Sequence, residues 1–247
     1  MIERKNSESA KAQDVIGAGI GHNPVIAEET KATGFYRATC VGPVEERRGE
    51  YVMLRDQMYV AEAEAKKLFG LAAYLPKNRK KIADLQARIS AIPMEQKWSD
   101  GFQNVVTTQG KNELLDKGLA GSAYTAAWYI GLISSVSYSA VAATDTAANI
   151  NGSNGWKEAA GTNAPNYSQG TRVSATFGAA SGGSKATSSA SSFSITGSGT
   201  VKGCFLINNS TKDGTSGQLY SAGLFTGGDK TVANGDTLNV SYTATLT

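Results

Sequence analysis

Strict alternation of apolar and polar residues marks the last ten positions of the chain. The apolar residues stand at every second position: Leu238, Val240, Tyr242, Ala244 and Leu246. A period of two is typical of a β-strand with one buried face and one polar face. The turn Asn234-Gly235-Asp236, which precedes it, contains residues that tolerate positive φ. We therefore predict a half-buried strand over residues 238–247.

Five further segments of the C-terminal part have strand-like patterns separated by turn residues: 124–134, 171–180, 191–197, 200–208 and 217–227. The Ser-, Thr- and Gly-rich stretch 174–200 is also compatible with a flexible linker, but Phe193 and Ile195 favour strands and turns there. Residues 101–247 therefore predict a mainly β fold, an antiparallel β-sandwich of the jelly-roll or immunoglobulin-like type.

Helical spacing appears in two places. A short amphipathic helix is predicted over 111–119, with Leu114, Leu115 and Leu119 on one side. A second helix is predicted between Pro76 and Pro93, in which four apolar residues follow each other at spacings of 3, 4 and 3: Ile82, Leu85, Ile89 and Ile92. This a/d seam favours a homotrimeric coiled coil, although two heptads are equally compatible with packing inside one chain.

The N-terminal part divides into three predicted regions. Residues 1–34 are rich in glycine and polar residues and predict an extended arm, ordered by a partner through six apolar residues: Val15, Ile16, Ile20, Pro24, Val25 and Ile26. Residues 35–76 predict a small β module, with strands at 35–41, 50–55 and 58–60 and a helix from Ala61. Residues 77–100 predict a helix and linker.

Charge is distributed unevenly along the chain. Residues 1–100 contain 16 Lys and Arg and 14 Asp and Glu, 30 of the 45 charged residues, which supports a boundary near residue 101. The net charge of +3 gives no broad basic surface, so nucleic acid is not an expected partner. No run reaches the roughly 18 apolar residues of a membrane span. The two cysteines have no close-spaced partner, which fits a reducing cytoplasm.

Candidate chemistry is sparse. The single histidine, His22, lies in the predicted arm, where a catalytic role is disfavoured. Asp229 and Asp236 stand in turns without the spacing of a calcium loop, and no carboxylate pair indicates a glycosidase. We therefore predict no catalytic, cofactor or metal site. Trp156 and Tyr167, near predicted loops, are candidate glycan contacts, while Trp128 lies in an alternating strand and is expected in the core.

Two segments of the β-rich part resemble a known family. "NVVTTQGKNELLDKGLAGSAYTAAWYIGLIS" (104–134) and "GQLYSAGLFTGGDKTVANGDTLNVSYTATL" (217–246) resemble small β-rich structural proteins of tailed-bacteriophage virions, over about residues 103–247. The resemblance implies a virion component and no catalytic residues.

The expected function is therefore a capsid decoration (cement) or head-fibre protein. It would bind the major capsid protein through its N-terminal region, display the β-domain, and be assembled into virions in the bacterial cytoplasm. The alternative is a tail-fibre or adaptor protein whose β-domain binds a host-surface glycan. A glycan-cleaving enzyme is disfavoured by the isolated carboxylates.

Overall fold

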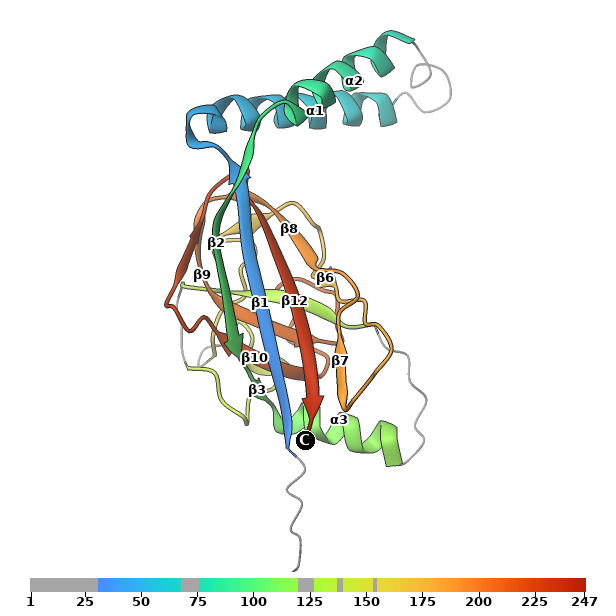
Figure 1. Cartoon of the computed structure of the whole chain (residues 1–247), viewed down its shortest axis with the longest axis vertical. Coiled ribbons are helices and arrows are strands. Elements are labelled where there is room, and N and C mark those ends of the chain that lie inside the picture. The colour runs from blue at the N-terminus through green and yellow to red at the C-terminus, as the bar shows by residue number, and fades with distance from the viewer. Residues whose placement is uncertain (1–30, 68–75, 120–126, 137–139, 153–154) are drawn as a thin grey trace, which may run out of the picture. The chain divides into compact units, whose positions relative to one another are not determined.

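The computed structural model of the protein describes residues 31–67, 76–119, 127–136, 140–152 and 155–247. Within these ranges the strands form two six-stranded antiparallel sheets that pack face to face (Figure 1). The mainly β architecture and the β-sandwich predicted from the sequence are confirmed.

The first sheet has the order β2-β1-β12-β8-β5, with β7 also paired to β12. Its strands are β1 (Ala32–Pro43), β2 (Met94–Gln103), β5 (Asn166–Tyr167), β7 (Ser184–Ala186), β8 (Ser191–Gly197) and β12 (Thr237–Leu246). The second sheet has the order β3-β10-β9-β4-β6, with β11 paired to β9. Its strands are β3 (Val105–Val106), β4 (Tyr129–Ser134), β6 (Val173–Ser174), β9 (Gly199–Ile207), β10 (Leu219–Leu224) and β11 (Lys230–Val232).

The main core lies between the sheets. Alternate residues of β12 enter it, since Leu238, Val240 and Tyr242 are buried whereas the residues between them are half-exposed. β1 contributes Tyr36 and Ala38 by the same alternation. The alternation predicted for the terminal strand is confirmed, because one face of this sheet is packed and the other is solvated.

The second sheet is buried on both faces. A second apolar cluster covers its outer side, where Trp156 and Ile150 pack on Phe205 and Ile207 of β9. This covering segment contains the 3-10 helix η2 (Ala147–Asn149). Burial on both faces explains why β4 and residues 204–207 of β9 are almost continuously apolar and do not alternate.

The predicted boundary near residue 101 is wrong. β1 pairs with β12 from Ala32 opposite Leu246 to Val41 opposite Thr237, and with β2 on its other side. Residues 31–247 accordingly form one compact unit. The change in charge density that suggested a boundary reflects the helices inserted between β1 and β2, not a separate N-terminal domain.

The inserted segment is a helical hairpin of α1 (Arg48–Lys67) and α2 (Pro76–Ser90), preceded by the 3-10 helix η1 (Glu45–Arg47). It stands at the end of the sandwich where β1 finishes and β2 begins (Figure 1). The strands predicted at 50–55 and 58–60 are wrong, as both segments lie in α1, whereas the strand at 35–41 is confirmed.

The a/d seam of α2 packs inside the hairpin. Leu85 and Ile92 are buried against Leu54 and Ala61 of the α1 side, and Ile82 and Ile89 pack against the same cluster. The seam therefore has its partner within the chain, because α1 supplies the apolar face that a second copy was expected to supply. The homotrimer remains a prediction, and these seam residues no longer support it.

The remaining helix, α3 (Thr108–Leu119), confirms the helix predicted over 111–119. The stretch 174–200 is folded into strands and turns as predicted, with Phe193 and Ile195 fully buried in β8. Among the described residues, no helix is both long enough and apolar enough to cross a membrane.

Candidate functional site

The arm residues predicted to bind a capsid lie outside the described residues: Val15, Ile16, Ile20, Pro24, Val25 and Ile26. What the structure adds is the place where that segment joins the sandwich. Lys31 donates its backbone N–H to the carbonyl oxygen of Thr247 at 2.5 Å, at the start of β1 and the end of β12. The predicted arm also ends earlier than residue 34, because Ala32 already pairs with Leu246.

The predicted glycan contacts are buried. Trp156 is fully enclosed in the outer core and donates its indole N–H to Asp145 Oδ2 at 3.0 Å. The ring of Tyr167 packs edge-on against Phe193 on one side and under the Lys212 ammonium group, 3.5 Å from its centroid, on the other. Neither ring leaves a face for a sugar, so these two assignments are wrong.

A contiguous site is instead built around α3. Thr107 caps this helix by accepting the Gly110 N–H at 3.0 Å, and its own N–H binds the Tyr220 carbonyl oxygen at 3.0 Å. Gly110 permits this close seating, since a Cβ there would lie 2.3 Å from the Tyr220 carbonyl oxygen. Gln109 Oε1 accepts the Leu219 N–H at 2.8 Å. The first turn of α3 is thus fixed on β10.

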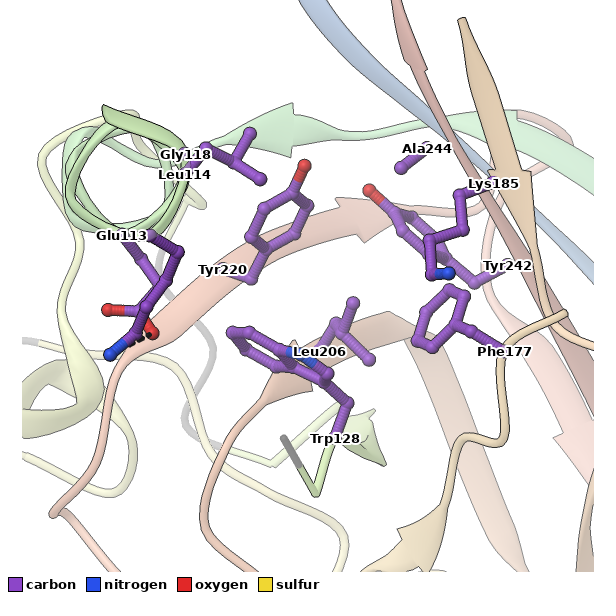
Figure 2. Close-up of a pocket in the computed structure, with 11 residues that line it drawn as sticks. Glu113, Leu114, Gly118, Trp128, Phe177, Lys185, Leu206, Tyr220, Tyr242 and Ala244 are labelled. Carbon is purple, nitrogen blue, oxygen red and sulfur yellow. Dashed lines mark ion pairs between the residues drawn. The ribbon is translucent and has the colours of Figure 1, made fainter. Parts of the chain in front are cut away.

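Beyond this first turn, α3 passes over an apolar groove of about 420 Å³ between the sheets (Figure 2). Both sheets, α3 and two loops contribute to its walls. The lining residues are Glu113, Leu114, Lys117, Gly118, Trp128, Phe177, Lys185, Leu206, Tyr220, Tyr242 and Ala244. Trp128 is buried, as predicted, and its ring meets Tyr220 edge-on at 5.6 Å between centroids.

Charged groups are confined to the rim of this groove. The Glu113 carboxylate is largely buried and forms an ion pair with Lys117 at 3.8 Å. Lys185 of β7 donates to the Gly178 carbonyl oxygen at 2.8 Å. Gly118 faces open space, because a Cβ added there meets no atom within 4 Å.

Exposed leucines surround the same end of the sandwich. Leu115 and Leu119 of α3 are 57% and 84% exposed, and Leu246 of β12 is 49% exposed. Leu114 lines the groove and is also exposed. The sequence indicated the apolar side of this helix. It did not indicate that the side stays uncovered, because that depends on how far α3 extends past the sheets.

A second, polar cleft of about 500 Å³ also borders α3. Hydroxyl, amide and carboxylate groups line it: Thr108, Gln109, Asn112, Glu113, Asp116, Thr144, Thr146 and Gln218. Glu113 contributes to both the cleft and the groove. Sequence analysis missed the cleft, because residues 108–116 and 144–146 meet only in the folded chain.

One fully buried ion pair has a structural role. Arg172 donates through Nε and Nη2 to the Glu158 carboxylate at 3.0 and 2.8 Å, and both side chains are fully buried. The Asp213 N–H also donates to Glu158, so the pair fixes the loop that follows β9. Burial raises the pKa of the Glu158 carboxyl group, and the adjacent guanidinium opposes that shift. Among the described residues, His, Cys, Asp and Glu form no group of three or more with metal-binding geometry.

The chain matches no protein-family model, no curated protein and no solved structure.

Proposed function

We propose that this protein is a structural component of a tailed-bacteriophage virion, a capsid decoration or head-fibre protein. It attaches to the major capsid protein by the α3 end of the sandwich, together with residues 1–30, and it carries the helical hairpin on the side away from the capsid.

One observation carries this proposal. The end of the sandwich where the chain enters β1 is also the end that exposes the leucines of α3 and β12. Exposed apolar surface rimmed by polar residues is typical of a protein interaction site. A segment rich in glycine, with a few apolar residues, gains order by binding alongside such a surface. Both features therefore support attachment at this end.

The position of the hairpin supports this orientation. β1 has 12 residues, so the start of β1 and the hairpin are separated by roughly 40 Å of strand. The start of β1 and the hairpin thus lie at opposite ends of the sandwich, and one flat capsid surface is not expected to contact both. This differs from the sequence-based expectation, in which the whole N-terminal region bound the capsid.

The rest of the sandwich suits exposure on a particle. Its first and last described strands are neighbours in the middle of one sheet, so neither is an open edge. The buried pair Glu158 and Arg172 fixes a loop that would otherwise be a free segment. A locked module of this kind is consistent with display on a virion.

The experiment is quantitative mass spectrometry of purified virions. We expect a copy number close to a simple fraction of the number of major capsid proteins, because decoration occupies a repeated lattice position. A handful of copies per virion, as for a tail component, would contradict capsid decoration. Absence from virions would contradict a structural role altogether.

A second candidate function is favoured by the polar cleft. Amide, hydroxyl and carboxylate groups such as Asn112, Asp116 and Thr144 are suited to the hydroxyl groups of a sugar. A tail-fibre or adaptor protein that binds a host-surface glycan would place this cleft outward. The copy number separates the two functions, since an adaptor is present at tail-protein abundance.

A further inference from the structure

We infer that the groove beneath α3 receives an apolar anchor side chain, aromatic or branched aliphatic, from a segment of the capsid protein that carries an acidic residue beside it. This inference rests on the proposed function and deepens it, because it assigns the chemistry of one contact within the α3 end of the sandwich.

The size and lining of the groove indicate an apolar occupant. An apolar cavity of about 150 Å³ suffices to bind benzene, and this groove measures about 420 Å³. Aromatic rings from both sheets form its walls, as Figure 2 shows for Trp128, Phe177, Tyr220 and Tyr242. Pockets of this kind take apolar groups and use a few polar groups to fix orientation.

The surroundings of the groove favour a protein segment over a free small molecule. Leu115 and Leu119 lie on the helix that roofs the groove and are exposed. A small ligand inside the groove would leave them in water. A segment that lies across α3 covers them and inserts an anchor at the same time, as expected for an interface in which one anchor fills a pocket.

The charge at the rim of the groove indicates which kind of residue stands beside the anchor on the partner segment. Glu113 and Lys117 offset each other as an ion pair. Lys185 uses one of its three N–H donors on the Gly178 carbonyl oxygen. Among the described residues, no carboxylate forms an ion pair with Lys185. The rim therefore has a net positive charge next to the apolar walls, which complements an acidic side chain on the partner.

Gly118 allows a direct test. Gly118 lines the groove and a Cβ there meets no atom within 4 Å, so Gly118→Trp adds a large side chain to the groove lining without a clash at its Cβ. Gly49, in the second position of α1, has equally open surroundings. Gly49→Trp is therefore a matched control at the opposite end of the molecule.

The measurement is co-sedimentation of the full chain and its variants with capsids that lack this protein. We expect Gly118→Trp to bind at least about 10-fold more weakly, and Gly49→Trp to bind like the unaltered chain. Equal binding by Gly118→Trp would overturn the groove contact while leaving the proposed function intact. Failure of the unaltered chain to bind would overturn the proposed function and this inference together.

A charge variant of Lys185 tests whether the capsid segment carries an acidic residue beside its anchor. Lys185→Gln keeps an N–H donor for Gly178 and removes the charge, and Lys66→Gln removes an exposed charge from the hairpin. We expect Lys185→Gln to bind capsids several-fold more weakly at low salt, with the difference lost at high salt. Equal capsid binding by the two variants at low salt would contradict an acidic residue on the capsid segment.

A small-molecule occupant is the remaining alternative. Calorimetric titration of the full chain with dodecanoate tests this alternative directly. Saturable binding that Gly118→Trp abolishes, combined with unchanged capsid binding by the same variant, would assign the groove to an amphiphile and overturn the inference. We expect instead no saturable binding of dodecanoate by the unaltered chain, and capsid binding that Gly118→Trp weakens.

Discussion

Asp236 lies where the helical hairpin meets the sandwich. Its carboxylate accepts hydrogen bonds from Arg48 Nη1 at 2.7 Å and from the Ala233 N–H at 2.8 Å, and its side chain is only 4% exposed. Gly42 gives it room, because a Cβ there would lie 2.0 Å from Asp236 Oδ1. The sequence predicted a turn role for this residue, which the Ala233 contact confirms. Its ion pair with Arg48, which lies 188 positions earlier in the chain, could not be predicted from the sequence.

Replacement of Asp236 should loosen the foot of the hairpin. We expect Asp236→Ala to lower the free energy of unfolding by about 2 kcal/mol, because Arg48 stays largely buried and keeps only the exposed Glu45 carboxylate and the Asn234 carbonyl oxygen as partners. Urea unfolding at pH 7 measures the change. Asp229→Ala is the control: its pair with Lys202 is exposed and should contribute less than about 1 kcal/mol. Equal losses in the two variants would contradict the assigned role.

The two cysteines, Cys40 and Cys204, should be inert in the folded protein. Both are fully buried, and burial raises the pKa of the Cys40 thiol to about 12 and that of Cys204 further still. The thiolate is the reactive form. We therefore expect neither residue to react with a thiol reagent between pH 7 and pH 9, whereas two thiols react in denaturant. Labelling that accelerates with pH like an ordinary cysteine would show that a site opens.

Single residues also show where sequence reasoning was insufficient. Trp128 was correctly expected in the core from its strand pattern, but Trp156 was expected near a loop surface. It is buried because the loop itself forms a second layer over β9, which no local pattern reveals. The pairing of Glu158 with Arg172 was missed for the same reason. The two residues lie on segments that only the folded chain brings together.

Among the elements, the helical hairpin shows why propensity misled. The sequence near Tyr51 and Val52 contains aromatic and β-branched residues, which favour strands. The structure forms a helix there because Leu54 and Ala61, seven residues apart, both face α2. Tertiary packing along one helical face outweighed the local preference.

Truncation of a single seam side chain should destabilise the helical hairpin and leave the sandwich unaffected. We expect Leu85→Ala to reduce amide protection in α1 and α2 by roughly 30-fold, equivalent to about 2 kcal/mol of lost packing, with β12 unaffected. Hydrogen exchange resolves the two regions, and sedimentation should give an unchanged mass. A lower mass would instead mean that the seam joins separate copies.

Two glycines of α3 should respond in opposite ways. Gly118→Ala should raise the free energy of unfolding by up to about 1 kcal/mol, because alanine is the better helix former and the site is open. Gly110→Ala should lower it by more than about 1 kcal/mol, because its Cβ would clash with the Tyr220 carbonyl oxygen. Thermal unfolding of both variants is the measurement. A stabilising Gly110→Ala would contradict the seating of α3 on β10.

For the molecule as a whole, the sequence predicted the fold class and most strands but not their long-range pairing. The terminal strand, β8 and α3 were identified from local periodicity. The partnership of β1 with β12 joins residues about 200 positions apart, and neither strand carries a local mark of it. The insertion of the hairpin between β1 and β2 could not be predicted for the same reason, and neither could the position of the hairpin at the end of the sandwich opposite the start of β1.

The central claim is that the α3 end attaches to the capsid while the hairpin points outward. Cryo-electron microscopy of capsids saturated with the full chain tests this most directly, because the hairpin identifies one end of the sandwich unambiguously. The account predicts ordered density at a repeated lattice position, with α3 and Leu246 against the capsid and α1 and α2 distal. Density with the hairpin seated on the capsid surface, or no density at any lattice position, would contradict it.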